Sequence, residues 1–196
     1  MSPRTKKQIQ HIKETTRGKI LLAALETISK EGYAGSSISK IAKKAGISKG
    51  NIYNHFLNKE ELIKVVLLEG MKSIVNEYTN LKDGIKTKEE FTKMVDQNFE
   101  VLSKNHSYWK LYYSVLLQPQ LFQLIQEEMM EMTSPIIKTF TEYFKTINYK
   151  DPEAVTWAFI SSLDGITLSY VMNPEWYPLD KVKQSIINIY TKHNRP

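Results

Sequence analysis

The sequence predicts an all-α protein, and three observations support this. Apolar residues recur three and four positions apart along nearly the whole chain, which is the spacing of one face of a helix. No stretch alternates between apolar and polar residues in the way a half-buried strand does. Capping residues, glycines and prolines separate the periodic segments, and no internal repeat or low-complexity segment is present.

Four helices are predicted in the first third of the chain, over about residues 16–30, 38–45, 48–55 and 58–78. Two glycines in the stretch EGYAGSS end the first helix, and Gly46 ends the second. The fourth carries Glu60 and Glu61 in its first turn, where the helix dipole favours acids. The predicted cap residues are, in order, Thr15 or Thr16, Ser37, Ser48 and Asn58.

The rest of the chain is also predicted to be helical. After a turn at KDGIKT, helices are expected over about residues 87–104, 106–117, 119–147, 152–172 and 179–192. Pro135 should kink or interrupt the third of these, because proline lacks the N–H that a helix interior needs. The proline-bounded stretch NPEWYP is a loop before the last helix.

The composition places the chain among soluble globular proteins. Of its 196 residues 41% are apolar, and it has no cysteine, which excludes disulfides, thiol chemistry and cysteine-based zinc sites. The first residues lack the apolar core of a signal peptide, and no apolar run approaches the about 20 residues of a membrane span. We therefore expect a cytoplasmic protein.

Charge is distributed unevenly along the chain. Residues 1–60 hold 12 Lys and Arg against 4 Asp and Glu, a net charge of +8, whereas the remainder carries −2. Such an asymmetry favours a polyanionic partner for the N-terminal end. A solvated basic surface, a nucleic acid and an anionic membrane surface are the three interpretations that charge alone leaves open.

Residues 38–56 have the pattern of a helix-turn-helix motif, two short helices joined by a tight turn at Gly46. Ile38, Ile41, Ala42, Ile47, Ile52 and Phe56 supply its apolar face. The second helix then exposes side chains that bind phosphates or base edges, as a major-groove recognition helix must. A membrane anchor would not require these residues in this order. The predicted DNA-binding residues are Ser37, Lys40, Ser48, Lys49, Gly50, Asn51, Tyr53, Asn54, His55 and Lys59.

Each of these residue types has a specific use at a DNA surface. Lys49 can reach a guanine edge or a phosphate, and Asn51 or Asn54 an adenine edge. The helix N-termini at Ser37 and Ser48 offer free N–H groups to phosphate oxygens. Tyr53 is expected at a phosphate rather than in the core, while His55 is open between a DNA contact and packing. Lys59 is expected at a phosphate. Gly50 has no side chain, so the helix backbone can approach the DNA closely. Arg4, Lys6 and Lys7 form a basic N-terminal arm.

Residues 16–62 resemble the DNA-binding domain of the TetR family of bacterial transcriptional regulators. The resemblance rests on Ile20, Ala23, Ala24, Glu31-Gly32-Tyr33, Ile38, Ile41-Ala42, Ala45-Gly46, Ser48-Lys49-Gly50, Tyr53, His55-Phe56, Lys59 and Glu60-Glu61-Leu62, spaced without a gap. It implies two domains: an N-terminal arm and DNA-binding domain over 1–62, and a helical ligand-binding and dimerisation domain over 63–196.

The resemblance also implies a homodimer. Residues 163–176 are similar to the penultimate helix of the family, which pairs with the last helix across a dimer axis. Ordinary packing within one chain is the alternative explanation for this small-residue helix. The predicted dimer-interface residues are Ala158, Ser162, Gly165, Ile166, Ser169, Ile186 and Tyr190.

Aromatic residues and methionines are frequent between residues 91 and 172, where most must form the core. Some of them could line an apolar cavity between helices, because methionine adapts to irregular shapes and tyrosine or tryptophan adds a polar tip. Asp164 within an apolar helix could cap a terminus, pair across the dimer or meet a cationic group. The predicted ligand-lining residues are Trp109, Tyr113, Phe122, Met129, Trp157 and Asp164.

These features predict a dimeric repressor that a small apolar or aromatic ligand releases from a palindromic double-stranded operator. A TetR-like activator, or a regulator controlled by a protein partner, is the alternative. An enzyme is not expected, because the four histidines are scattered and no catalytic motif is present. No cofactor, metal or membrane partner is predicted.

Overall fold

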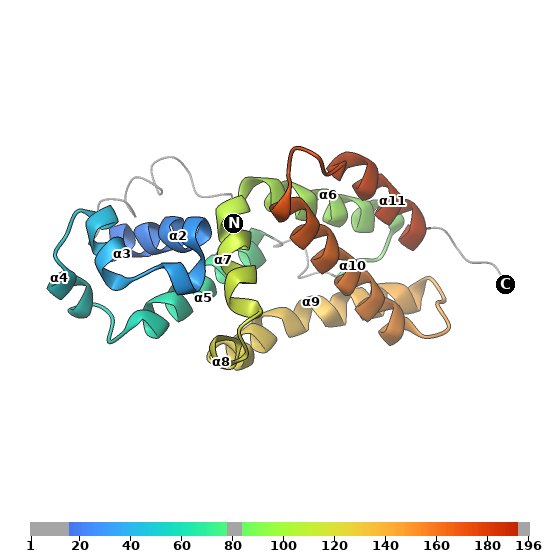
Figure 1. Cartoon of the computed structure of the whole chain (residues 1–196). Coiled ribbons are helices and arrows are strands. Elements are labelled where there is room, and N and C mark those ends of the chain that lie inside the picture. Colours follow the sequence, from blue (N-terminus) through green and yellow to red (C-terminus); the bar gives the residue numbers. More distant parts are fainter. Residues whose placement is uncertain (1–15, 78–83, 192–196) are drawn as a thin grey trace. The chain divides into compact units, whose positions relative to one another are not determined.

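A computed structural model describes residues 16–77 and 84–191 of the chain. The described residues form helices and connecting turns without a strand, so the all-α prediction is confirmed (Figure 1). The predicted basic arm with Arg4, Lys6 and Lys7 lies outside the described residues. In chain order the helices are α2 (Thr16–Gly35), α3 (Ile38–Ala45), α4 (Lys49–Tyr53), α5 (Lys59–Glu77), α6 (Lys88–Lys104), α7 (His106–Leu116), α8 (Pro119–Phe122), α9 (Gln126–Thr146), α10 (Pro152–Met172) and α11 (Leu179–Thr191).

Local capping signals place most helix starts where the sequence predicts them. Ser37 and Ser48 accept backbone N–H groups at the starts of α3 and α4, and the Asp151 carboxylate does so for α10. Thr87 and Glu90 form a reciprocal capping box at the start of α6. Each of these bonds satisfies a donor that a helix terminus otherwise leaves without a partner.

The prediction of one long helix over 119–147 is wrong, because the helix is interrupted between α8 and α9. Leu121 and Ile125 are both buried there, and three-residue backbone hydrogen bonds, such as Ile125 N–H to the Phe122 carbonyl at 3.0 Å, replace the α-helical pattern. Of the two effects expected of Pro135, an interruption does not occur, because α9 continues through this residue; a kink there stays a prediction. Pro135 lies on an exposed surface, where water can satisfy the carbonyl that loses its helical donor.

The described residues group into two compact units. The first contains α2–α5, α7, α8 and α9 up to Met129, and the second contains α6, the rest of α9, α10 and α11. This grouping rests on contacts between residues and does not test function. The predicted boundary between a DNA-binding domain and a ligand-binding domain after residue 62 stays a prediction.

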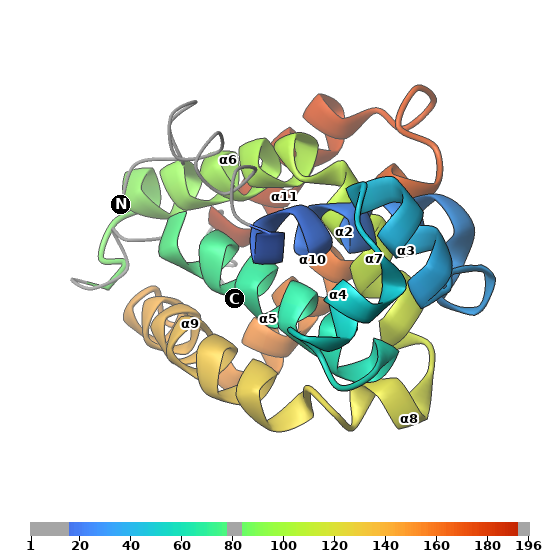
Figure 2. The ribbon, with the colours of Figure 1, turned by 90° about the vertical axis from the view of Figure 1, so that its left-hand side faces the viewer.

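The first unit is built on α2, which packs against α3 and α5, while α3 packs against α4 (Figure 2). Ile20, Ile28, Ile41, Ile52 and Leu62 have no exposed surface, so the short helices are fixed by a shared apolar core. This core sets the orientation of α4, which is too short to be stable alone.

The second unit has an aromatic core. Phe91 on α6 stacks on Tyr143 of α9 with ring centroids 4.7 Å apart, and Phe159 of α10 lies 4.9 Å from both Phe140 and Tyr190. Rings at such distances contribute about 0.5–1.5 kcal/mol per pair beyond burial alone. Most of the predicted aromatic segment is therefore core, as expected for residues of this type.

One described helix, α10, is long and apolar enough to cross a membrane by length and composition, with a mean hydropathy of 1.2. The expectation that no apolar segment approaches the length of a membrane span is therefore wrong. Only 28% of the apolar window is buried within the chain, and Trp157 is 56% exposed.

Candidate functional site

Two capped helices and a left-handed glycine form the helix-turn-helix. The Ser37 Oγ accepts the Lys40 N–H at 3.3 Å, and the Ser48 Oγ accepts the Asn51 N–H at 3.2 Å. Between them Gly46 has φ +70°, a conformation that a side chain disfavours, and the Ile47 N–H donates to the Ala42 carbonyl at 3.1 Å. The turn therefore needs the glycine that the sequence provides.

Apolar residues hold this motif together and against α2. Ile41 and Ile52 have no exposed surface, and Phe56 is 3% exposed. The prediction that Phe56 belongs to the core is confirmed. Arg17 of α2 lies over the Phe56 ring, with its guanidinium carbon 5.6 Å from the ring centroid, and pairs with Glu69 at 2.7 Å. Arg17 therefore covers one side of this core.

The opposite face of α4 is open to solvent and polar. Ser48, Lys49, Gly50, Tyr53, Asn54 and His55 are exposed, and Asn51 is half-buried. Tyr53 is 47% exposed and its ring centroid lies 5.8 Å from the Lys49 ammonium, so it is not a core residue. The structure thus brings a cation, a phenol, two amides and an imidazole onto one short surface, with helix N-termini at Ser37 and Ser48 nearby in sequence.

Two of the predicted DNA-binding lysines have partners inside the protein. The Lys40 ammonium pairs with Glu31 at 2.5 Å and donates to the Gly35 carbonyl at 2.7 Å. The Lys59 ammonium donates to the carbonyls of Tyr33 and Ser36 at 2.5 and 2.7 Å. Sequence reasoning did not find these partners, because the residues involved are up to 26 positions apart.

The predicted ligand-lining residues fall into two sets. Tyr113 and Met129 are buried in the first unit, where Trp109 and Phe122 are half-buried. Trp157 and Asp164 lie on α10 of the second unit and are exposed at the surface. Neighbouring atoms still withdraw the Asp164 carboxyl partly from water, and this desolvation raises its pKa.

A row of aromatic rings follows α7 in the first unit. Trp109 lies 5.3 Å from Tyr108 and 5.6 Å from Tyr112, and Tyr112 lies 5.2 Å from Tyr113, between ring centroids. The Trp109 indole N–H is buried without a hydrogen-bond partner in the part of the chain that the structure describes. Such a donor costs stability unless another molecule accepts its hydrogen bond.

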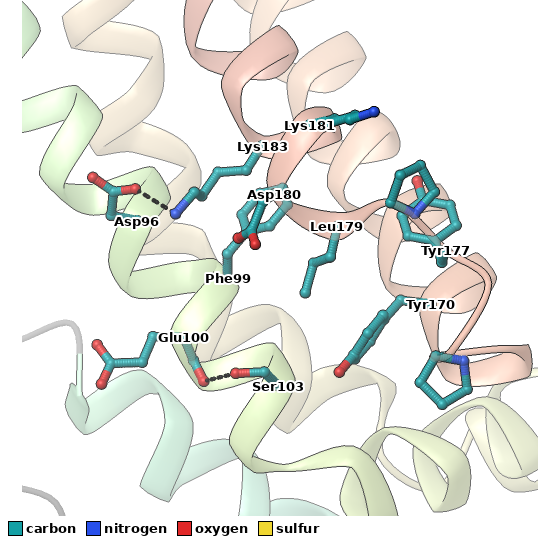
Figure 3. A pocket seen from close by; sticks show the side chains of 12 residues that line it. Asp96, Phe99, Glu100, Ser103, Tyr170, Tyr177, Leu179, Asp180, Lys181 and Lys183 are labelled. Atoms are coloured by element: carbon teal, nitrogen blue, oxygen red, sulfur yellow. Dashed lines mark hydrogen bonds and ion pairs between the residues drawn. The ribbon is translucent and has the colours of Figure 1, made fainter.

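An open groove of about 770 Å³ lies in the second unit, between α6, the end of α10 and the start of α11 (Figure 3). Phe99, Tyr170 and Leu179 line it, and none of the predicted ligand-lining residues does. Asp96 pairs with Lys183 at 3.0 Å, and Glu100 pairs with Lys104. Two of the carboxylates that line the groove, Asp96 and Glu100, therefore already have cationic partners.

The predicted dimer residues also divide in two. Ala158, Gly165 and Ser169 are exposed on α10 and Ser162 is half-buried there. Ile166, Ile186 and Tyr190 are buried within the second unit, at 7–8% exposure, with Tyr190 packed 4.9 Å from Phe159. Exposed apolar residues that the sequence analysis did not assign to this surface lie close in sequence: Trp157, Met172, Trp176 and Ile189.

This fold and the exposed face of α4 define a helix-turn-helix DNA-binding transcriptional regulator with an additional helical body. Residues 20–66 match the family model described as bacterial regulatory proteins, tetR family. The part of the chain that carries the helix-turn-helix is therefore a TetR-family DNA-binding domain.

Similar proteins extend the comparison over nearly the whole chain. The fatty acid metabolism regulator protein of Bacillus subtilis is 27% identical over 184 residues, covering 90% of this chain and 95% of that protein. The structure of the fatty acid degradation regulator FadR from Bacillus halodurans matches with a TM-score of 0.73 and 23% identity, over 90% of this chain and 98% of that one. FadR from Bacillus subtilis in complex with stearoyl-CoA matches with a TM-score of 0.69 and 23% identity, over 89% and 98%. The two structural likenesses show the fold.

Proposed function

We propose that this regulator is a cytoplasmic homodimeric repressor, held on a palindromic operator by two α4 helices and released by a long-chain acyl thioester. The observation that carries the DNA-binding part is the exposed polar face of α4 on an apolar, well-packed helix-turn-helix. A side-chain set of this kind, on a helix whose other face is buried, suits the major groove.

The proposed contacts follow from exposure and chemistry. Lys49 and Tyr53 bind phosphate or base edges, and Asn51 and Asn54 select bases through their amides. His55 is exposed and belongs to the same DNA-facing surface. The free backbone N–H groups at the helix N-termini near Ser37 and Ser48 donate to phosphate oxygens, and Gly50 lets the helix approach the groove closely.

A dimer is proposed because one short recognition helix reads few base pairs, whereas two set about 34–36 Å apart read a palindrome. The exposed part of α10 supports this, since Ala158, Gly165 and Ser169 leave room for a second helix beside exposed Trp157. Self-association would remove this apolar surface from water.

Two observations suggest the class of ligand: the similarity to known regulators and the indole N–H of Trp109, which has no partner among the described residues. A relative that aligns with nearly the whole chain is a fatty acid metabolism regulator, and a structurally similar FadR holds stearoyl-CoA. In this chain Trp109, Tyr113, Phe122 and Met129 provide apolar surroundings that are buried or half-buried, and the Trp109 indole N–H needs an acceptor. A thioester carbonyl on a long apolar chain meets both requirements. Asp164 stays a prediction as a ligand or dimer contact.

Release requires that the ligand bind more tightly to the conformation that does not fit the operator. By linkage, operator DNA must then weaken binding of the same ligand by an equal factor. This reciprocity is measurable without knowing which genes are controlled.

The first experiment is selection of bound sequences from a random duplex pool with the full chain. An enriched palindrome is expected, with affinity falling steeply as salt rises. Stearoyl-CoA should then release the duplex, and free coenzyme A at equal concentration should not. Binding without any enriched sequence would contradict the operator proposal.

Transcription from a promoter carrying the selected sequence tests the sign of regulation. A repressor lowers transcript yield and the acyl thioester restores it. Increased transcription by the unliganded protein would instead support the activator alternative. If no acyl thioester changes operator affinity while a protein partner does, the ligand part of the proposal fails and the DNA-binding part stands.

A further inference from the structure

Four residues join the two ends of the helix-turn-helix segment 37–58, and we call them the Tyr33 clamp: Tyr33, Ser36, Lys59 and Glu60. Tyr33 lies in the last turn of α2, Ser36 follows that helix, and Lys59 and Glu60 begin α5. The chain between them carries α3, the Gly46 turn and α4. Both ends of this segment meet at the clamp. The contacts of the clamp therefore help to fix the position of the segment.

The Lys59 ammonium closes the clamp through backbone acceptors. It donates to the Tyr33 carbonyl at 2.5 Å and to the Ser36 carbonyl at 2.7 Å. The Ser36 hydroxyl also donates to the Tyr33 carbonyl, at 2.8 Å, and Ser36 is 5% exposed. Ser37, the cap of α3, follows directly. Lys59 therefore fixes the turn that leads into the helix-turn-helix.

Tyr33 is held on two sides. The Lys59 ammonium lies 3.9 Å from the centroid of its ring, and its hydroxyl donates to the Glu60 carboxylate at 2.7 Å. A cation over a tyrosine face and a charge-assisted hydrogen bond are both favourable. The charges of Lys59 and Glu60 thus act on the same side chain.

The ionisation of the clamp agrees with these contacts. Burial lowers the pKa of the Lys59 ammonium, and the hydrogen bond from Tyr33 lowers the pKa of the Glu60 carboxyl. Two carbonyls take two of the three N–H donors of the Lys59 ammonium, and the Tyr33 ring covers one side of it, so little of this cation is open to a phosphate. Lys49, by contrast, is exposed on α4.

We propose that the Tyr33 clamp positions the recognition helix for its operator, and that Lys59 is a positioning residue of this clamp rather than a phosphate ligand. The proposal rests on the proposed function of α4 as the operator reader. It assigns to Lys59 a role different from the phosphate contact expected from the sequence. Tyr33 and Glu60 then affect operator binding without touching DNA.

Positioning and phosphate binding have different signatures in DNA affinity. A lost phosphate contact weakens binding to all duplexes alike and makes the salt dependence shallower by about 0.9 in slope per contact. A misplaced recognition helix weakens operator binding but leaves non-specific binding, which is mainly electrostatic, nearly unchanged. The ratio of operator affinity to non-specific affinity separates the two roles.

The test measures this ratio against salt for the full chain and for Tyr33→Phe, Lys59→Met, Lys49→Met and Lys72→Met. Tyr33→Phe removes one hydroxyl and no charge, so it is the decisive variant. We expect its ratio to fall about tenfold, which is the scale of one charge-assisted hydrogen bond, with the slope unchanged. Lys59→Met should lower the ratio at least as much and also keep its slope. Lys49→Met should have a shallower slope, and Lys72→Met, an exposed lysine on α5, controls for lost charge alone.

A reduced affinity caused only by partial unfolding would lower both affinities together, so an unchanged ratio in Tyr33→Phe overturns the proposal. A shallower slope in Lys59→Met, beyond that of Lys72→Met, would make Lys59 a phosphate ligand and overturn it as well. Failure of the proposed function is seen separately, because wild-type protein would then prefer no sequence before any variant is made.

Discussion

The ring of Tyr108 on α7 lies so close to Gly70 of α5 that a Cβ at position 70 would stand 2.2 Å from the Tyr108 Cε2. The Tyr108 hydroxyl donates to the Leu67 carbonyl of the same helix at 3.1 Å, and the residue is 5% exposed. Gly70 is therefore a packing requirement: it lets α7 approach the helix that starts at the Tyr33 clamp.

We predict that Gly70→Ala destabilises the protein by about 1–3 kcal/mol, the cost of an overpacked site, although alanine is the better helix former. Denaturant unfolding of the variant and of wild type measures this difference. Gly50→Ala is the matched control, because a Cβ there meets only the Ser48 Oγ, at 4.0 Å. Equal stabilities of the Gly70→Ala and Gly50→Ala variants would show that α7 moves away at little cost.

Two buried tyrosines provide an opposed pair of substitutions. The Tyr143 hydroxyl has no hydrogen-bond partner among the described residues, whereas its ring stacks on Phe91. Tyr143→Phe keeps the stacking and removes an unsatisfied group, so we expect a stabilisation of about 1 kcal/mol. Tyr108→Phe removes a satisfied hydroxyl and should destabilise by about the same amount. Thermal or denaturant unfolding of both variants under one condition decides this, and a loss of stability in Tyr143→Phe would contradict it.

The Tyr33 clamp also predicts a dependence of stability on alkaline pH. Burial, followed by the hydrogen bond to Glu60, raises the pKa of Tyr33 from 10.0 to about 12. A folded-state pKa above the unfolded value means that the protonated phenol stabilises the fold fully below pH 10, and that this contribution is lost between pH 10 and 12. The charged groups that face it are Lys59, whose pKa is lowered by burial, and the Glu60 carboxylate.

Because other tyrosines of the chain also have raised pKa values, only the difference between wild type and Tyr33→Phe isolates this contribution. We expect the stability difference between the two proteins to be constant from pH 8 to about 10 and to shrink above it. Unfolding curves across this range measure it. A difference that stays constant up to pH 12 would mean that the Tyr33 phenol ionises alike in both states.

The amino-acid sequence predicts the helix-turn-helix well because its signals are local. Ser37, Gly46 and Ser48 act within four residues of their hydrogen-bond partners, so their positions can be read directly. The apolar spacing likewise predicts that Ile52 and Phe56 are buried.

Features that depend on distant residues could not be predicted in this way. Lys59 meets Tyr33 across 26 positions, whereas its place shortly after the recognition helix in the sequence suggests a phosphate contact. The contact of Tyr190 with Phe159 within the chain could not be read from the spacing either, and the place of Tyr190 at a dimer interface stays a prediction. Pro135 is a strong local signal, yet the helix breaks at residues 123–125, where burial of Leu121 and Ile125 decides the path.

The exposed apolar part of α10 predicts an effect on self-association. Trp157 is 56% exposed, so Trp157→Asp costs the folded monomer little but places a charge in the proposed dimer interface. We expect a dissociation constant at least about 30-fold higher, consistent with a loss of about 2 kcal/mol at a buried tryptophan. Sedimentation equilibrium measures this constant.

Leu117→Asp is the control for an exposed apolar residue outside α10, because Leu117 is 75% exposed. It should leave the association constant unchanged. If both variants stay dimeric and Trp157→Asp alone loses the response to stearoyl-CoA, Trp157 belongs to the ligand site that the sequence suggested, not to the dimer surface.

The last prediction concerns the buried indole N–H of Trp109, which lacks an acceptor among the described residues. Trp109→Phe keeps an aromatic ring in the α7 row and removes only the donor together with part of the apolar area. If a thioester carbonyl accepts this hydrogen bond, the variant should need about tenfold more stearoyl-CoA to release the operator. Its operator affinity without ligand should match wild type, because the substitution lies outside the helix-turn-helix. Phe122→Leu, which alters apolar contact but no donor, is the control for lost surface. Competition titrations with the selected duplex measure both quantities, and equal responses of Trp109→Phe and wild type would exclude the indole as a ligand donor.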